Sequence, residues 1–163
     1  MKIIDLLRYT PEKEKRFHES RIVGKTGLAT LGESMLNDMR VLDSKSSAIL
    51  NLISLVIAAL TFGLSVVDGK DENAEIIRFV FYFFMAVFSL AAAIDIRCVY
   101  NMDGDDFPEN ASEEDVLKIL LHEITLRRRR YGIALQIVRI GVYLLFAFML
   151  VWLIYSYKIN MII

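Results

Sequence analysis

The sequence has few of the side chains that most often carry out chemistry, with one cysteine and two histidines in 163 residues. The one cysteine, Cys98, cannot form an intramolecular disulfide, and we expect its thiol to be inert. His18 and His122 have no Cys or carboxylate at metal-ligand spacing, so we expect surface histidines and no metal site. No nucleophile elbow or glycine-rich dinucleotide turn occurs either. We therefore expect no catalytic residues, no cofactor and no enzymatic activity.

The net charge is also small, −1 from 19 basic and 20 acidic residues, which excludes a global attraction to nucleic acid. What the sequence has in excess is apolar residues, at 55% with a mean hydropathy of +0.44, against roughly 45–50% apolar in an average soluble domain. Apart from Lys158, the charges are confined to residues 1–45, 68–78 and 95–139. This segregation predicts an integral membrane protein.

Three runs without charge are long enough to cross a bilayer. Residues 46–67 would form a helix of about 33 Å, which matches a hydrocarbon core of about 30 Å. Residues 79–94 are shorter, but the preceding Arg78 can extend its charge to the interface. Residues 140–157 end in Trp152, Tyr155 and Tyr157, which is typical of an aromatic belt at the headgroup level. We expect three transmembrane helices.

The basic residues predict the orientation, because Lys and Arg near membrane spans are retained in the cytoplasm. Residues 1–45 contain nine of them and 95–139 contain seven, whereas 68–78 contain two and 158–163 contain one. The N-terminal arm and the 95–139 segment are therefore expected to be cytoplasmic. The acidic 68–78 segment becomes an external hairpin loop, and 158–163 becomes an external tail.

Both predicted cytoplasmic segments contain helical patterns that continue into the membrane. Residues 28–45 have apolar positions at helical spacing, and Pro11 suits the first turn of a short helix before them. Ser112 with Asp115 resembles an N-cap, from which one helix of about 45 residues could run through the third span. Its cytoplasmic part has an apolar stripe: Leu117, Leu120, Leu121, Ile124, Tyr131, Leu135 and Val138. We expect an all-α membrane protein, with three transmembrane helices and helical extensions packed as a small cytoplasmic bundle.

A run of four arginines, Arg127, Arg128, Arg129 and Arg130, precedes the third span. Its simplest role is to fix topology and contact anionic membrane lipid. Because successive helix positions point the four guanidinium groups in different directions, some of them could instead bind an anionic ligand such as a nucleotide phosphate. Salt bridges between subunits, to the acidic 103–115 run, are a third interpretation.

Polar and small residues follow one another into the first span. Asp43 and Lys45 lie just outside it, where a charge must face water or a partner, and Asn51 and Ser54 lie inside it. We treat these four as candidate membrane-entrance or gating residues, although Asp43 and Lys45 could form a plain membrane-edge pair.

Further along the first span, Ala59 and Gly63 have small-xxx-small spacing, and Asn51, Ser54, Ala58 and Ser65 fall within about half of the helix surface. Such residues favour helix–helix contact over a pore lining. Ala59 and Gly63 are therefore candidate contacts of a homo-oligomer. At the end of the second span, Asp95 and Arg97 favour an interfacial pair over a buried charge.

The segment Met35-Leu-Asn-Asp-Met-Arg40 followed by Leu42-Asp-Ser-Lys-Ser-Ser-Ala-Ile-Leu50 resembles the start of the first membrane helix in Pycsar transmembrane effectors and the related SLATT group of small bacterial proteins. The shared pattern is Asp43-x-Lys45-x-x-Ala48-x-Leu50. Residues 124–141, with their arginines and Tyr131, are similar to the end of that domain. The resemblance covers roughly residues 30–157.

This resemblance implies an anti-phage defence effector of the bacterial inner membrane, which oligomerises and permeabilises that membrane when infection is signalled. It also implies a cyclic nucleotide or a defence partner protein as the trigger, although the chain has no separate ligand-binding domain. The residues alone leave two other functions open. One is a non-enzymatic accessory or scaffold subunit of a larger membrane complex, and the other is a small ligand-gated channel.

Overall fold

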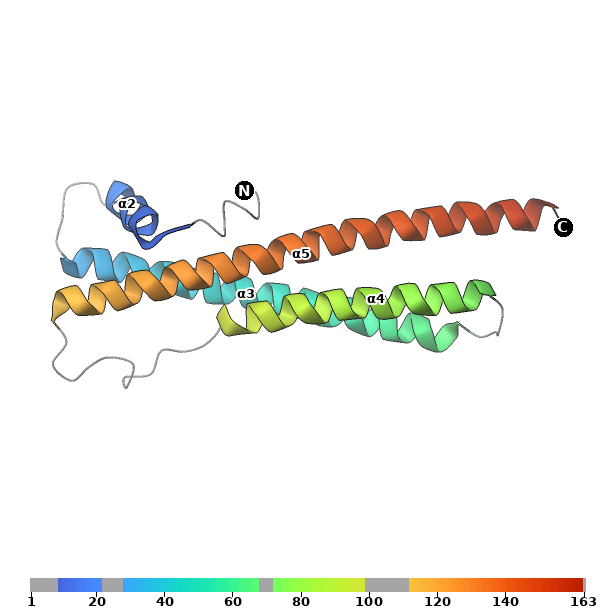
Figure 1. Ribbon diagram of the computed structural model, residues 1–163, viewed down its shortest axis with the longest axis horizontal. Coiled ribbons are helices and arrows are strands. Elements are labelled where there is room, and N and C mark those ends of the chain that lie inside the picture. Colours follow the sequence, from blue (N-terminus) through green and yellow to red (C-terminus); the bar gives the residue numbers. More distant parts are fainter. Residues whose placement is uncertain (1–8, 22–27, 68–71, 99–111, 163) are drawn as a thin grey trace.

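The computed structural model describes residues 9–21, 28–67, 72–98 and 112–162, and within these ranges it contains helices and no strands. The elements are α2 (Pro11–Arg21), α3 (Leu28–Val66), α4 (Glu72–Asp95), the short 3-10 helix η1 (Ile96–Cys98) and α5 (Glu113–Ile162). Figure 1 shows α3, α4 and α5 lying roughly along one long axis, with α2 across one end. The prediction of an all-α fold is confirmed.

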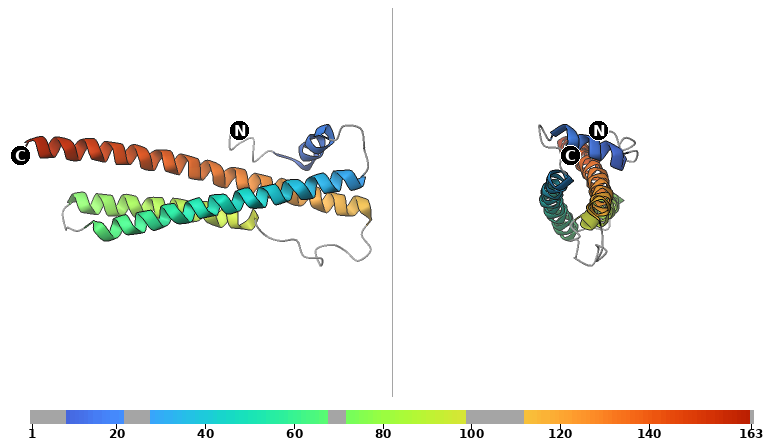
Figure 2. Two further views of the ribbon diagram at one scale, coloured as in Figure 1. Left: turned by 180° about the vertical axis from the view of Figure 1, so that it is seen from behind. Right: turned by 90° about the vertical axis from the view of Figure 1, so that its left-hand side faces the viewer.

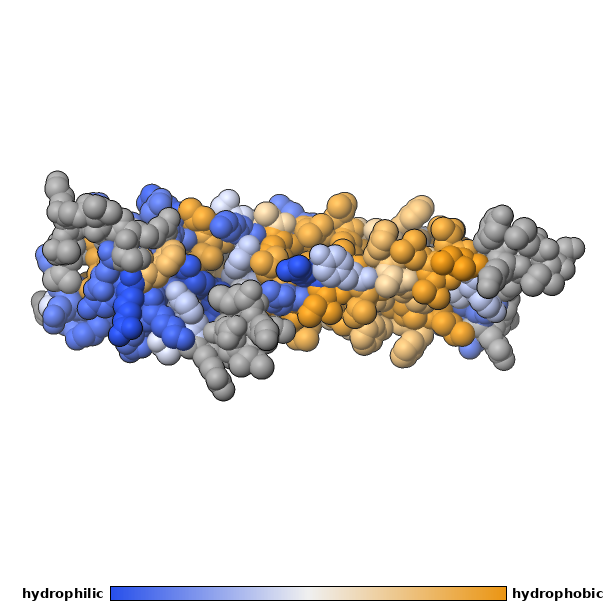
Figure 3. Space-filling view, turned by 90° about the horizontal axis from the view of Figure 1, so that it is seen from above, coloured by the Kyte–Doolittle hydropathy of each residue, from blue (hydrophilic) through white to orange (hydrophobic). Residues whose placement is uncertain are grey.

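Three of these helices are long and apolar enough to cross a membrane: Leu31–Val66, Asn73–Cys98 and Glu113–Tyr155. Polar residues gather on the half of the molecule near α2, and apolar residues cover the other half (Figure 3). The chain is therefore an all-α, multi-pass membrane protein. Helix α4 begins at Glu72, so most of the segment predicted as the 68–78 loop is helical. Residues 68–71 and 99–111 lie outside the described residues.

Helices α2 and α5 begin where the sequence predicts. Pro11 is the first residue of α2, and the carbonyl of Thr10 accepts hydrogen bonds from the amides of Lys13 and Glu14. Ser112 caps α5: its hydroxyl accepts from the Asp115 amide at 3.3 Å and donates to the Asp115 carboxylate at 2.6 Å. Helix α5 then continues without a break for 50 residues, as predicted from the lack of helix-breaking residues.

Two hydrophobic cores hold the helices together. The first joins the polar halves of α3 and α5, as the apolar stripes predict: Leu31, Met35, Met39, Leu42, Leu117, Leu120, Leu121 and Ile124. The second joins the apolar parts of α3, α4 and α5: Ile49, Ile53, Leu60, Phe84, Phe88, Ala91 and Val138. One member of the predicted α5 stripe, Leu135, is instead exposed.

Seen from behind in Figure 2, α3 crosses α5 between its two ends and lies beside α4 in the apolar half. Helix α4 packs closely on both neighbours there. A Cβ atom placed on Gly63 of α3 would lie 2.6 Å from the Phe81 ring, and one on Gly141 of α5 would lie 3.1 Å from the Phe88 ring. The two glycines therefore allow these helices to approach each other.

Candidate functional site

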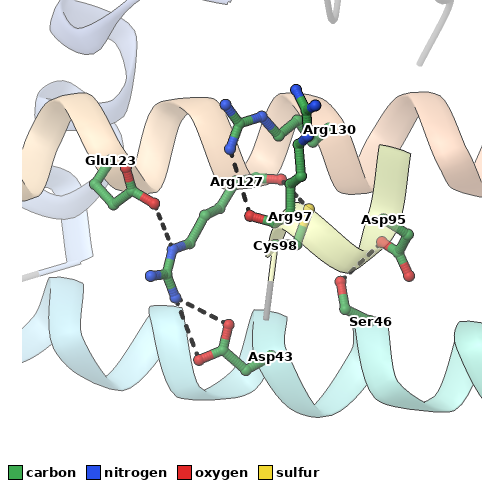
Figure 4. Close-up of polar contacts among 8 residues, drawn as sticks. All are labelled: Asp43, Ser46, Asp95, Arg97, Cys98, Glu123, Arg127 and Arg130. Atoms are coloured by element: carbon green, nitrogen blue, oxygen red, sulfur yellow. Dashed lines mark hydrogen bonds and ion pairs between the residues drawn. The ribbon is translucent and has the colours of Figure 1, made fainter. Parts of the chain in front are cut away.

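Buried and half-buried polar groups lie together between the two hydrophobic cores, where α3, η1 and α5 meet. We call this set the polar junction; its members are Asp43, Ser46, Asp95, Cys98, Glu123 and Arg127 (Figure 4). The junction exists because the end of α4 and the η1 turn bring Asp95 and Cys98 against the same stretch of α3 and α5 that separates the cores.

Arg127 is the centre of the junction. Its side chain is 3% exposed, and its guanidinium donates to Asp43 of α3 at 3.0 Å and to Glu123 of α5 at 2.8 Å. A buried guanidinium between two carboxylates is electrically compensated, whereas one left alone would be strongly destabilising. Arg127 is thus bound within the chain and points toward α3, not toward solvent.

A second contact of the junction links α3 to the end of α4. The Ser46 hydroxyl donates to Oδ1 of Asp95 at 2.9 Å, and both side chains are fully buried. The other carboxylate oxygen, Oδ2, is buried and has no hydrogen-bond partner among the described residues. The prediction that Asp95 forms an interfacial pair with Arg97 is therefore wrong. Ser46 supplies a polar partner inside the bundle, and Asp95 turns inward to it while Arg97 is exposed.

The third contact involves Cys98, the last residue of η1. Its side chain is completely buried, and its Sγ donates to the backbone carbonyl of Arg127 at 3.5 Å. The 3-10 turn therefore rests on α5 at the level of the Arg127 ion pairs. The thiol's role visible here is packing, and its reactivity stays a prediction.

Helix α2 is joined to the bundle by Arg128, the next arginine of the run. The Arg128 guanidinium lies 2.9 Å from Glu14 of α2 and 3.2 Å from Asp38 of α3. His18 bridges the same elements, with Nε2 at 3.1 Å from Glu14 and Nδ1 at 3.0 Å from Ser34. We call Glu14, His18, Ser34, Asp38 and Arg128 the α2 cluster.

The α2 cluster corrects the expectation that His18 is a surface residue, because Glu14 and His18 are both fully buried. Glu14 and His18 are four residues apart and so share one face of α2; α3 and α5 cover that face. No group of three or more His, Cys, Asp or Glu side chains in the described part of the chain is placed to hold a metal ion.

Aromatic side chains complete this contact. The Arg128 guanidinium lies over the Phe17 ring, 4.8 Å from its centre, at the distance of a cation–π interaction. Burial, together with a hydrogen bond to the Glu14 carboxylate and the charge of that group, raises the pKa of Tyr9 to about 12. Tyr9 therefore remains a neutral phenol next to Glu14 throughout the physiological range.

The other two arginines of the run point elsewhere. Arg130 donates from Nη1 to the backbone carbonyl of Arg97 at 3.4 Å. Arg129 is half-buried and has no ion pair within the described residues. The four guanidinium groups thus point in different directions, as their spacing predicts. Those of Arg127 and Arg128 form ion pairs within the chain. Ligand binding by the run stays a prediction.

The candidate residues of the first span lie mostly on the surface of α3. Lys45, Asn51, Ser54 and Ala59 are exposed. Gly63, in contrast, packs against Phe81 of α4 within the same chain. The oligomer contact through Ala59 and Gly63 stays a prediction. Of these two residues, Gly63 already contacts Phe81 of the same chain.

The exposed face of α3 has a regular pattern. Small and polar residues recur on it at alternating steps of four and three: Ser47, Asn51, Ser54, Ala58, Thr61 and Ser65. We call these six the small-polar stripe. The hydroxyls of Ser54, Thr61 and Ser65 donate to carbonyls of their own helix, those of Leu50, Ile57 and Phe62. For the Asn51 amide, no hydrogen-bond partner lies within the described residues.

Sequence reasoning missed the α2 cluster and the Ser46–Asp95 contact. The i, i+4 spacing of Glu14 and His18 was the one available signal for the first, and it does not tell which face of α2 is covered. The second joins residues 49 positions apart, and no local pattern predicts such a pair.

Comparisons with protein-family models, with curated proteins and with solved structures find no match for this chain.

Proposed function

We propose that this protein is an oligomeric membrane effector, whose spans associate through the small-polar stripe of α3 and permeabilise the membrane when a signal reaches the polar end of the bundle. The observation that carries this proposal is the exposure of the stripe. In hydrocarbon an unpaired amide such as that of Asn51 is costly, and small and polar residues are enriched where membrane helices pack together. A second copy of α3 would supply the missing partners.

The membrane half of α5 supports the same proposal. From Val142 to Tyr155 none of its side chains is buried. One chain thus forms three spans that share a small core, too few to enclose a pathway by themselves. Several copies could form one, or could disturb lipid packing.

The polar end of the molecule has the features expected of a control region. Helix α2 is attached through the α2 cluster, and the polar junction ties α3, η1 and α5 together where they enter the apolar half. A nucleotide or a partner protein that displaced α2 would uncover Glu14 and Arg128. We propose that such a signal acts there. The proposed role in anti-phage defence rests on the resemblance around residues 35–50, and so does the proposed location in the inner membrane of a bacterium. The proposed cytoplasmic N-terminus rests on the distribution of basic residues.

Overexpression in bacterial cells tests the proposal, with a potential-sensitive dye as the readout. The wild-type chain should depolarise the cells and arrest growth, and substitution of Asp43, Lys45 or Asn51 should abolish both effects. Leu52→Ala, next to Asn51 at an exposed apolar position, is the matched control and should remain toxic. If the wild-type protein causes no depolarisation at any expression level, the proposal is wrong.

The alternative is an accessory or scaffold subunit of a larger membrane complex, and the same exposed stripe favours it, because a different protein could cover that face. A harmless chain that purifies only with a second protein would support this alternative. A chain that conducts selectively in bilayers without killing cells would instead support a ligand-gated channel.

A further inference from the structure

A hollow of about 360 Å³ lies beside the end of α4, and it is lined by Ala93, Ile94, Arg97 and Arg130. Two of these residues are apolar and two are arginines. They come from three elements: Ala93 and Ile94 from the last turn of α4, Arg97 from η1 and Arg130 from α5. The hollow is therefore a product of the tertiary fold, which places residues 33 positions apart at one opening.

The two arginines bring two positive charges to one opening. In Figure 4 their guanidinium groups lie over α5 and away from α3, whereas that of Arg127 points toward α3. No carboxylate of the described residues forms an ion pair with either one. The nearest acid in the sequence, Asp95, is fully buried on the α3 side and accepts from Ser46. Within the described part of the chain, the two guanidinium groups at this opening therefore have no carboxylate partner.

The Arg130 guanidinium is partly oriented. Its Nη1 donates to the Arg97 carbonyl at 3.4 Å, which leaves the other N–H groups of its planar fork for a ligand. Guanidinium groups match the geometry of phosphate oxygens and bind them through paired hydrogen bonds. A phosphate between Arg97 and Arg130 would compensate both charges.

The other wall of the hollow indicates which phosphate. Ala93 and Ile94 end the apolar segment of α4, and Arg97 follows three residues later, so the hollow lies at the boundary between the apolar and polar halves of the molecule. A lipid headgroup has its phosphate at this level and its acyl chains on the apolar side. A free nucleotide would have to leave water to reach this level, whereas a lipid headgroup already lies there.

We propose that Arg97 and Arg130 bind the phosphate of an anionic phospholipid, with its glycerol and acyl region against Ala93 and Ile94. Phospholipid binding at this site does not require oligomerisation or toxicity, so it can be tested independently of the proposed function. Because η1 also rests on Arg127 through Cys98, a lipid bound there would hold the end of α4 against α5.

The test uses the full chain in detergent micelles, titrated with phosphatidylglycerol and followed by native mass spectrometry. The wild-type protein should retain phosphatidylglycerol in preference to phosphatidylcholine, whose phosphate is accompanied by its own choline cation. The double variant Arg97→Gln/Arg130→Gln should bind phosphatidylglycerol about tenfold more weakly, because it loses charge-assisted hydrogen bonds to the phosphate.

Two double variants separate a built site from general attraction. Arg16→Gln/Arg40→Gln removes the same number of charges at exposed positions outside the hollow and outside the arginine run, and it should bind as the wild type does. Arg97→Lys/Arg130→Lys keeps the charge but loses the guanidinium forks, and it should give an intermediate affinity while preserving the fold. Helicity by circular dichroism identifies any variant that fails to fold, in which case the lysine variant decides.

Three results would overturn the proposal. The first is equal phosphatidylglycerol binding by the wild type and by both hollow variants. The second is an equal loss in the Arg16→Gln/Arg40→Gln control, which would mean attraction by net charge alone. The third is displacement of phosphatidylglycerol by millimolar inorganic phosphate or ATP, which would assign the arginines to a soluble phosphate.

Discussion

The Arg127 guanidinium donates to the Asp43 carboxylate at 3.0 Å across 84 residues of sequence. The sequence indicates Asp43 by its place before the first span and Arg127 by its place in the arginine run. Because the two side chains form an ion pair, a substitution of either residue removes a charged partner from the other.

Removal of the Asp43 charge tests this pair. Asp43→Asn should lower the free energy of unfolding by about 1–3 kcal/mol, because the buried Arg127 guanidinium then loses the carboxylate that lies 3.0 Å away on α3. Thermal unfolding in detergent, followed by circular dichroism, measures the change. Lys45→Gln, two positions along and exposed, is the control and should change stability by less than about 0.5 kcal/mol. Equal effects of the two substitutions would contradict the ion pair.

Ser46 and Asp95 should show energetic coupling. Ser46→Ala leaves the buried Asp95 carboxylate without its one hydrogen-bond donor from α3, which should cost about 1–3 kcal/mol. When Asp95→Ala is already present, the same serine substitution should cost much less, because no buried carboxylate then needs a partner. A double-mutant cycle on unfolding free energies gives the coupling, and strictly additive effects would refute it.

The glycines of α3 should respond in opposite directions. Gly63→Ala places a methyl group 2.6 Å from the Phe81 ring and should destabilise the protein by about 1–3 kcal/mol through overpacking. Gly32→Ala meets nothing within 4 Å and should stabilise α3 by about 0.5–1 kcal/mol, since alanine is the better helix former. A Phe81→Leu background should relieve the first effect, and a failure to do so would place the strain elsewhere.

The attachment of α2 should weaken at alkaline pH. The pKa of Tyr9 is raised from its ordinary value of 10.0 to about 12 by burial and by Glu14. The folded state therefore holds the phenol proton more tightly than the unfolded state does. The resulting stabilisation is fully present below pH 10 and is lost as the pH rises through about 12.

Hydrogen exchange of residues 9–21, corrected for the intrinsic pH dependence of exchange, follows this loss. In wild type the protection of α2 should decline between pH 10 and about 12, the interval between the ordinary and the raised pKa of Tyr9. Tyr9→Phe removes the ionising group and should make that decline smaller. An identical decline in both proteins would show that Tyr9 does not control the contact.

Much of the fold could be predicted because its causes are local. Charge-free runs indicated three spans, the spacing of apolar residues predicted the contact of α3 with α5, and Ser112 with Asp115 predicted the start of α5. Contacts between distant segments could not be predicted in the same way. Asp95 and His18 were both assigned to the surface, yet each is buried by polar partners on another helix. A sequence pattern gives the face on which a residue lies, but the partner that covers that face is set by packing.

For the candidate site, the sequence indicated some of the residues that form it but not the contacts that they make. Asp43 and Arg127 form an ion pair in the polar junction, whereas Asn51 and Ser54 lie on the exposed surface of α3. The sequence could not tell that Arg127 pairs with Asp43, or Arg128 with Glu14 and Asp38, because these acids lie on other helices and show no fixed spacing to the run. Glu123, in contrast, lies four residues before Arg127 on α5, at a spacing that the sequence shows.

Helix α5 extends for 50 residues as one element, a length of about 75 Å at 1.5 Å per residue. A helix of this length can tilt as a rigid body about the point where it crosses α3 and η1. A tilt of about 5° over that length displaces one end relative to the other by roughly 6 Å, which is more than one helical turn. A small rearrangement around Arg128 that tilts α5 would therefore move the opposite end of the helix, across the membrane, by several ångströms.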